Sequence, residues 1–222
     1  MLTVEFHSHT IHSKDSLSSP EKILAACRKK GIDRIVITDH NTTRGALAAQ
    51  ALDPQRVIIG EEIMTTQGEL LTAFIQEEIP PGLTPMQTIE RLKEQGAFIS
   101  VSHPFDHYRG GYWKQSDLEK IIPYVDAIET FNARCMSAKA NQQAQAFAQQ
   151  QQLAGTAGSD AHAIFELGRA VMLLPEFSTA DELRDVIRQA QFKTRLSSPL
   201  VHFYSRYAVW TKKIFPNLLT KY

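Results

Sequence analysis

Five of the eight histidines in this 222-residue chain lie directly after short apolar runs. They are His7, His9, His40, His103 and His162, and the acidic residues Glu62 and Asp160 occupy equivalent positions. In an extended strand, residues two apart point the same way, so His7 and His9 can hold one ion, and Asp160 and His162 repeat that spacing. Imidazole and carboxylate groups together suit Zn, Mn or Fe, whereas a site for Mg or Ca alone would use oxygen ligands almost exclusively. The pattern therefore predicts a transition-metal site.

The apolar runs that precede these residues predict the strands of an α/β fold. Seven strands are expected, with a further strand-like stretch at Leu70–Ile75: Leu2–Phe6, Arg34–Thr38, Val57–Ile59, Phe98–Val101, Ala127–Glu129, Ala154–Thr156 and Ala170–Leu174. Helix signals separate them, such as Ser19-Pro20 before an apolar helix face and a capping box that begins at Thr84. This alternation predicts a largely parallel sheet. No glycine-rich dinucleotide loop follows a strand, so a closed or nearly closed barrel is preferred, in which strand ends far apart in sequence meet on one face.

Composition excludes several classes of protein. Lys plus Arg and Asp plus Glu are 24 each, and 43% of the residues are hydrophobic, which indicates a folded domain rather than a disordered tail or a bulk polyanion binder. Two cysteines, Cys27 and Cys135, are too few for a disulfide framework. The apolar runs are too short to cross a bilayer and no signal peptide is visible, so we expect a cytoplasmic protein. A serine hydrolase, an NTPase and a thiol redox enzyme are poorly supported, because their short motifs do not occur.

The C-terminal segment differs in composition from the rest of the chain. After Asp185 there are seven Lys or Arg residues and no acidic side chain, and five aromatic residues lie among the cations between Phe203 and Phe215. We expect a main domain at residues 1–196 and a basic aromatic appendage at residues 197–222. The appendage could track a phosphate backbone while bases stack on its rings. Alternatively, it forms an amphipathic helix or strand that packs four apolar residues against the barrel: Val209, Trp210, Ile214 and Leu218.

Five motifs, in order, resemble those of the PHP (polymerase and histidinol phosphatase) family. They are His7-Ser8-His9, Thr38-Asp39-His40-Asn41, Gly60-x-Glu62, Ser102-His103-Pro104 and Gly158-Ser159-Asp160-Ala161-His162. The resemblance extends from about residue 3 to residue 175 and does not cover the appendage. It implies a distorted seven-stranded (β/α) barrel of PHP type that holds two or three Mn, Fe or Zn ions, usually for phosphoester hydrolysis.

The same resemblance implies a set of metal ligands. These are His7, His9, Asp15, His40, Glu62, His103, Asp160 and His162. Several relatives carry a histidine soon after the third-motif glutamate, where this chain reads Gln67-Gly68-Glu69-Leu70. Glu69 would supply an oxygen ligand in place of a nitrogen, which leaves the identity of the second metal open.

The leading functional prediction is a metal-dependent phosphoesterase that hydrolyses phosphate esters of nucleotides or short oligonucleotide ends through a metal-activated hydroxide. Asp160 and His103 are the candidate proton-handling residues. Three further residues lie close after strand ends and are candidate substrate contacts: Arg134 and Arg169 as phosphate clamps, and Asn132. His107 is a weaker candidate for substrate contact.

Three alternatives remain open. The first is a phosphatase of another small phosphomonoester, such as histidinol phosphate. The second is an amidohydrolase-type C–N hydrolase, which would use a similar metal-bearing barrel on a carbonyl carbon. The third is a metal-stabilised binding module without catalysis, in which the barrel displays the basic tail. The expected partner is a small phosphorylated molecule or a single-stranded nucleic-acid end.

Overall fold

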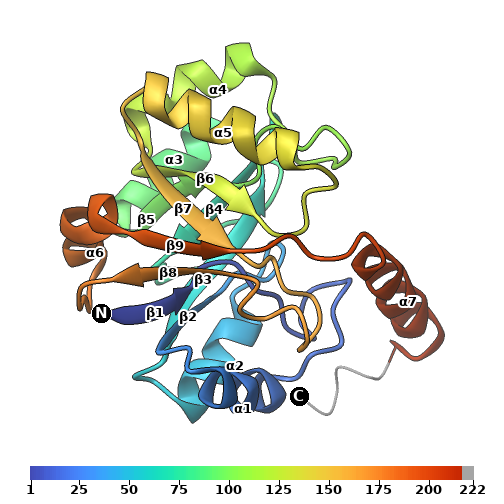
Figure 1. Cartoon of the computed structure of the whole chain (residues 1–222). Helices are drawn as coiled ribbons and strands as arrows, with labels where there is room; N and C mark the ends of the chain where they lie inside the picture. Colours follow the sequence, from blue (N-terminus) through green and yellow to red (C-terminus); the bar gives the residue numbers. More distant parts are fainter. Residues whose placement is uncertain (217–222) are drawn as a thin grey trace.

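The computed structural model describes residues 1–216, and in this range one nine-stranded sheet is surrounded by seven α-helices (Figure 1). The strands are β1 (Leu2–Glu5), β2 (Arg34–Ile37), β3 (Val57–Met64), β4 (Glu69–Ala73), β5 (Phe98–Val101), β6 (Ala127–Asn132), β7 (Ala154–Gly158), β8 (Ala170–Leu174) and β9 (Gln191–Thr194). The helices are α1 (Pro20–Lys30), α2 (Arg44–Leu52), α3 (Pro85–Glu94), α4 (Gln115–Ile121), α5 (Ala138–Gln150), α6 (Ala180–Val186) and α7 (Val201–Ile214). All seven expected strands and the strand-like stretch are present.

The sheet is mixed rather than largely parallel. Its order is β7-β6-β5-β4-β3-β2-β1-β8-β9, and four of the eight pairings are antiparallel: β3 with β4, β4 with β5, β1 with β8 and β8 with β9. The expectation of a largely parallel sheet is wrong at these places. Between β3 and β4 the cause is a tight hairpin turn, in which the N–H of Thr65 donates to the carbonyl of Gly68. Since β4 is antiparallel to both of its neighbours, β1, β2, β3, β5, β6 and β7 still run the same way. Their carboxyl ends lie on one edge of the sheet.

The carboxyl ends of β1 and β7 close the sheet into a barrel mouth. Ser8, just after β1, forms a parallel bridge with Ala161, just after β7, and the N–H of His9 donates to the carbonyl of Ala161 at 2.9 Å. The α/β barrel class is thus confirmed, although the sheet has nine strands rather than seven. The missed strand, β9, is Gln-Phe-Lys-Thr with all four residues exposed, so no apolar run marks it.

A hydrophobic cluster inside the barrel supports this mouth. It contains residues from every strand from β1 to β8, and Phe6 and Phe98 pack edge to face in it with ring centroids 5.7 Å apart. The expected helix ends are also present. Helix α1 ends at Gly31, whose φ of 67° is left-handed, and α3 begins with the capping box between Thr84 and Gln87. The fold below the mouth therefore follows from ordinary packing and capping.

Helix α7 lies beyond the carboxyl ends of the strands, at the right of Figure 1, and is attached to the loops of the mouth. The Lys212 ammonium donates to the carbonyls of Ile11 and Ser13, and Val201 and Ala208 are buried. The expected packing of Trp210 and Ile214 against the barrel is wrong, because they are 59% and 47% exposed. Leu218, in the same expectation, lies outside the described residues. The proposed domain boundary falls between β9 and α7, and no helix within residues 1–216 has the length and apolar character needed to cross a membrane.

Candidate metal centre

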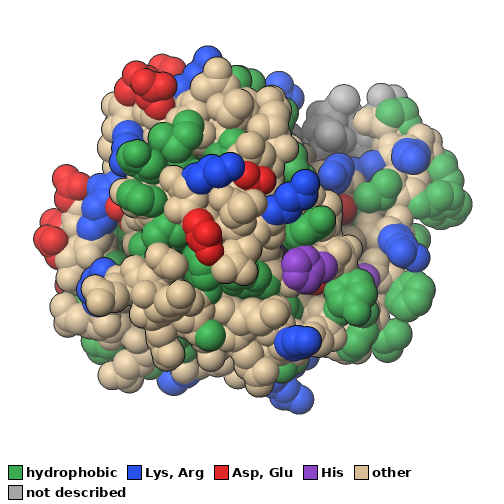
Figure 2. Space-filling view, turned by 90° about the horizontal axis from the view of Figure 1, so that it is seen from above, with side chains coloured by type: hydrophobic (Ala, Val, Ile, Leu, Met, Phe, Trp, Pro, Cys, Tyr) green, Lys and Arg blue, Asp and Glu red, His purple; other side chains and the backbone are tan. Residues whose placement is uncertain are grey.

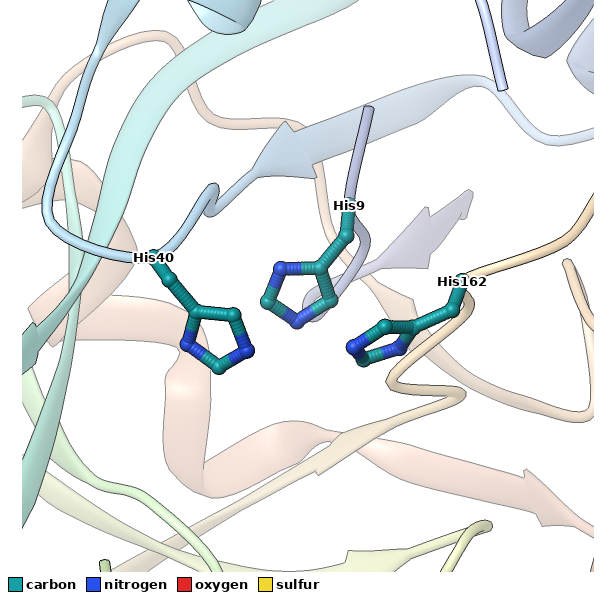
Figure 3. A group of neighbouring side chains, drawn as sticks. All are labelled: His9, His40 and His162. Carbon is teal, nitrogen blue, oxygen red and sulfur yellow. The ribbon is translucent and has the colours of Figure 1, made fainter. Parts of the chain in front are cut away.

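The strand ends bring all nine candidate ligands to the barrel mouth. His7 and His9 follow β1, His40 follows β2, Glu62 lies in β3, Glu69 begins β4, His103 follows β5, and Asp160 and His162 follow β7, while Asp15 comes from the loop after β1. Seven of the nine are buried, and Asp15 and His40 are partly exposed. Figure 3 shows three of the imidazoles, from three different strand ends, facing one another. Their ligand nitrogens lie within 4.8 Å of one another.

Four buried ligand atoms at the centre of this cluster form a closed ring. His7 Nε2 lies 3.3 Å from Glu62 Oε2 and 3.6 Å from Asp160 Oδ1. His9 Nε2 lies 3.5 Å from Glu62 Oε2 and 3.2 Å from Asp160 Oδ1. Within the described part of the chain, none of these four atoms has a hydrogen-bond partner. An ion with ligand bonds of about 2.1 Å holds tetrahedral ligand atoms about 3.4 Å apart, so the four residues fit a divalent metal ion.

Glu62 also connects this ring to a second, more oxygen-rich group. Its Oε2 lies 3.0 Å from His40 Nδ1, and its Oε1 lies 3.0 Å from His103 Nε2. Glu69 faces the same two histidines, with distances of 3.8 Å to His40 Nδ1 and 3.5 Å to His103 Nε2. Both carboxylate oxygens of Glu62 therefore face histidine nitrogens, and the residue belongs to both groups of ligand atoms.

Asp15 completes a third group of ligand atoms. Its Oδ2 lies 3.5 Å from His40 Nε2 and 3.2 Å from His162 Nε2, and its Oδ1 has no hydrogen-bond partner among the described residues. The ring of His9 is next to both histidines, with centroid distances of 4.5 Å to His40 and 4.1 Å to His162. The cluster thus has the donor chemistry of a divalent-metal site, while the ligand role of each residue stays a prediction.

Glu129, within β6, forms hydrogen bonds that hold His7 and the backbone of His103 in position. Its Oε1 lies 2.9 Å from His7 Nδ1, and its Oε2 accepts hydrogen bonds from the backbone N–H of His103 at 2.9 Å and from Asn132 Nδ2 at 3.0 Å. A carboxylate behind a ligating imidazole fixes its tautomer and raises its basicity. The sequence placed Glu129 only at the end of a predicted strand and gave no signal that its carboxylate would contact His7 and His103.

Asp39 holds the loop that carries His9 and Asp15. It accepts hydrogen bonds at 2.6 Å from both the N–H and the hydroxyl of Thr10, and one at 2.8 Å from Ser13 Oγ. Ser13 Oγ in turn lies 3.1 Å from His9 Nδ1. Asp39 of the second motif therefore acts as a structural anchor, with its carboxylate turned away from the ligand atoms and toward this loop.

The backbone at the mouth adopts conformations that ordinary residues avoid. Within the described residues five non-glycine residues have positive φ, and three of them, Asn41, His103 and Asp160, follow strands that carry ligands, with φ of 55°, 20° and 51°. Such strain concentrates at functional sites, where it aims side chains. Gly158, just before the last motif, allows β7 to approach His7, because a Cβ at this position would collide with the histidine.

The electrostatics of the cluster favour ionised ligands at its centre. Burial alone would raise the pKa of Asp160, but Arg109 and His7 outweigh it and hold this pKa well below its usual range. For Glu62, His7 and His40 likewise outweigh burial and hold the pKa well below its usual value. Burial and the neighbouring Glu62 instead raise the pKa of Glu69. A divalent cation would relieve this repulsion between the two glutamates.

Arg109 is the cation that the structure brings to the cluster, and the sequence analysis missed it. Its guanidinium donates to Asp160 Oδ2 and lies 3.5 Å from Asn132 Oδ1, while its Nε donates to Asp106 at 3.1 Å. The same Asp160 oxygen accepts a hydrogen bond from Asn132 Nδ2 at 3.1 Å. The available signal was a single arginine before Gly110-Gly111 in the loop after the His103 motif.

The two arginines expected as phosphate clamps lie elsewhere. The Arg134 side chain is 2% exposed and directed away from the cluster, because it pairs with Glu166 at 3.3 Å and donates to Ser205 Oγ at 2.9 Å. The Arg169 guanidinium makes no hydrogen bond or ion pair with the cluster within residues 1–216. His107 is exposed and its ring packs against Tyr112, with centroids 5.0 Å apart. Only Asn132 of the expected substrate contacts reaches the site.

Comparison with known families identifies the chain. The model of the PHP domain matches residues 5–138, and the model of the PHP-associated C-terminal region matches residues 138–192. The chain belongs to the PHP family. This match confirms the resemblance of the five motifs and the expected class of metal-dependent hydrolase. Helix α7 lies outside both matched ranges.

Individual relatives and solved structures agree with the family. Two uncharacterized proteins of Methanocaldococcus jannaschii are similar in sequence. MJ1587 is 38% identical over 146 residues, which cover 60% of this chain and 82% of that protein. MJ0417 is 37% identical over 180 residues, which cover 80% of this chain and 72% of that protein.

Solved structures with the same fold include PsfC from Pseudomonas syringae, which has a TM-score of 0.68 at 19% identity and covers 93% of this chain and 97% of that one. A Bifidobacterium adolescentis protein, provisionally described as a metal-dependent phosphoesterase, has a TM-score of 0.62 at 16% identity, covering 82% and 94%. The lesion-specific endonuclease PfuEndoQ from Pyrococcus furiosus has a TM-score of 0.57 at 16% identity, covering 86% of this chain and 57% of that one. These similarities establish a shared fold.

Proposed function

We propose that this PHP protein is a metal-dependent phosphoesterase that hydrolyses phosphate esters of nucleotides or of short oligonucleotide ends. The observation that carries the proposal is the pairing of a multidentate, buried ligand cluster with the Arg109 guanidinium at its edge. Carboxylate and imidazole groups that can bind metal ions, next to a guanidinium, suit an anionic substrate that also coordinates metal. The phosphoesterase and the endonuclease among its structural neighbours act on the same type of bond.

The three overlapping ligand groups support two or three ions, with Mn, Fe or Zn as the candidates. The central ring supplies two imidazoles and two carboxylates, and the group around Glu69 supplies two carboxylates and two imidazoles. Divalent ions bound there would supply a nucleophile at neutral pH and would neutralise charge on the phosphoryl group. The oxygen of Glu69 favours Mn in the second position, because harder donors suit Mn better than Zn.

The two carboxylate oxygens of Asp160 face different groups. Asp160 presents Oδ1 to the two histidines of the first motif and Oδ2 to Arg109 and Asn132. A phosphoryl oxygen near this point would meet the guanidinium and the Asn132 amide. Asp160 and His103 stay the proposed proton-handling residues, and the Nδ1 of His103 has no hydrogen-bond partner among the described residues.

A release screen tests the proposed function. Purified protein with added Mn is incubated with nucleotides, a short 5′-phosphorylated single strand, histidinol phosphate and a panel of amides, and both phosphate and ammonia are measured. We expect phosphate from the nucleotide substrates. Ammonia release without phosphate would favour the amidohydrolase alternative, a hundredfold preference for histidinol phosphate would favour the small phosphomonoester alternative, and metal content without any turnover would favour the binding module.

Arg109→Ala is expected to weaken phosphoester turnover by about a hundredfold, because it removes a charge-assisted contact with the phosphoryl group. Arg109→Lys should recover only part of the loss, since an ammonium cannot reproduce the planar fork. The measurement is kcat and KM for the best substrate of the screen. Arg44→Ala, an exposed arginine at the start of α2, is the control. Equal kcat/KM in Arg109→Ala and the wild type would remove Arg109 from the site.

The outer face of α7 carries exposed rings beside cations and is the candidate track for a single strand. Tyr207 and Trp210 are 55% and 59% exposed, with ring centroids 6.4 Å apart, and Lys213 follows on the same helix. Figure 2 shows hydrophobic and basic side chains mixed on this part of the surface. Base stacking is worth about 1–3 kcal/mol per base, so the rings could hold bases that extend from the mouth.

The double variant Trp210→Ala, Lys213→Ala is therefore expected to weaken binding of a short single strand by about tenfold and to leave hydrolysis of a small model ester unchanged. The matched control is Tyr124→Ala, Lys93→Ala, an exposed ring and lysine that lie 5.1 Å apart on another face. Binding is measured by fluorescence anisotropy at two salt concentrations. Identical affinities in the wild type and the Trp210 variant would contradict nucleic-acid binding by α7.

A further inference from the structure

A cavity of about 530 Å³ lies between helix α7 and the loop that carries Arg109. One side is formed by Asp106, Tyr108 and Arg109, and the other by His202, Phe203 and Arg206. Its volume falls within the range of about 300–1,000 Å³ found for small-molecule sites. The cavity lies outside the three ligand groups and shares only Arg109 with the proposed phosphate site.

Arg109 connects the cavity directly to the metal centre. The arginine lines the cavity, and its guanidinium contacts Asp160 of the ligand ring and lies near Oδ1 of Asn132. Asp106, buried on the floor of the cavity, accepts a hydrogen bond from Arg109 Nε at 3.1 Å and holds the guanidinium in this position. A phosphoryl group bound at the mouth therefore has the cavity next to it, on the far side of Arg109.

The walls of the cavity have the chemistry that binds a planar aromatic ring. Tyr108 and Phe203 lie on the two sides of the cavity and are 82% and 65% exposed, so both rings are accessible to a ligand. Arg109 and Arg206 add two guanidinium planes, which stack on rings and attract anions. An aliphatic ester group would not stack on these rings and guanidinium groups, whereas a nucleobase has two π-faces, one toward each side of the cavity.

We propose that this cavity binds the nucleobase of the substrate, so that a nucleotide lies with its phosphate at the metal centre and its base between the 106–109 loop and α7. This proposal rests on the proposed phosphoesterase function and names the part of the substrate that the cavity recognises. The side of the cavity formed by α7 belongs to the appendage of this chain, since α7 lies outside the ranges that match the family models.

The test compares a phosphate ester that carries a nucleobase with one that has no base. A nucleoside 3′,5′-bisphosphate and glycerol phosphate are assayed with the full-length, metal-loaded wild type and with Tyr108→Ala, Phe203→Ala and Phe203→Trp. We expect each alanine variant to raise KM for the nucleotide about tenfold and to leave KM for glycerol phosphate unchanged. Phe203→Trp should retain the low KM, because it keeps an aromatic face. Phe192→Ala, an exposed ring on β9 outside this cavity, is the control and should behave as the wild type.

A binding measurement separates the cavity from the reaction. The dissociation constant of adenosine monophosphate is measured by equilibrium dialysis for the same variants, and we expect about tenfold weaker binding for Phe203→Ala. If the wild type hydrolyses neither substrate, the proposed function fails, while weaker adenosine monophosphate binding by the alanine variants would still support the cavity. Equal nucleotide KM values and equal adenosine monophosphate binding across wild type and variants would overturn the proposal, as would an equal loss with glycerol phosphate.

Discussion

Glu62→Gln is expected to reduce phosphoester turnover by on the order of a thousandfold or more, because Glu62 belongs to two of the three ligand groups and lies against a histidine of the third. Its Oε2 faces His7 and His40 at 3.3 Å and 3.0 Å, and its Oε1 faces His103 at 3.0 Å. A glutamine keeps the size of the side chain but loses the charge and one acceptor oxygen. The metal content, measured by elemental analysis, should fall together with kcat.

The adjacent residue provides a matched control for this variant. Glu61 is equally buried but points to the other side of β3, where its carboxylate accepts a hydrogen bond from the N–H of Ile79 at 3.0 Å. Burial raises the pKa of Glu61 to about 8, so this carboxyl is largely protonated at neutral pH and glutamine is close to its neutral form. Glu61→Gln should retain activity and metal. A Glu62→Gln protein with wild-type turnover would show that the cluster does not carry out the chemistry.

Removal of metal is the second change with a large expected effect. Purified protein should contain at least two divalent transition-metal ions per chain, and dialysis against a strong chelator should abolish phosphoester hydrolysis. The thermal midpoint should fall as well, because the buried carboxylates of Glu62, Glu69 and Asp160 would then lose the cation that offsets the repulsion between Glu62 and Glu69.

Returning Mn should restore both properties. At a free concentration one hundred times the dissociation constant, binding stabilises the folded state by about 2.7 kcal/mol per site, which a thermal shift experiment can measure. Asp185→Ala, which removes an exposed carboxylate far along the chain on α6, serves as the control. Less than one ion per chain after metal-replete expression would refute a multinuclear centre.

The sequence by itself predicted which candidate ligands meet at the barrel mouth, because sheet geometry constrains strand ends strongly. Once His7, His40, His103 and His162 are each placed after a parallel strand, they must reach the same edge, whatever the connecting helices do. Glu69 was added to the candidate ligands through the resemblance to the PHP family, and in the structure its Oε2 lies 3.5 Å from His103 Nε2. The strands could also be predicted from the sequence, since alternating and apolar runs mark buried strands. Only β9 was not predicted among the described strands, because all four of its residues are exposed.

Tertiary structure alone decided which residues lie around the cluster, because a loop has no periodicity that aims its side chains. Arg134, close after β6, was the natural candidate for a phosphate clamp, yet its guanidinium is committed to Glu166 and to α7. Arg109, six residues beyond His103 in a loop, reaches Asp160 through contacts that span 51 positions of sequence. The placement of α7 has the same origin. Its composition predicted a basic, aromatic segment, but the hydrogen bonds of Lys212 to the first loop and of Arg134 to Val201 and Ser205 attach the helix to the barrel mouth. Local patterns thus determine what a strand end carries, and long-range hydrogen bonds and ion pairs determine which loop residues join it.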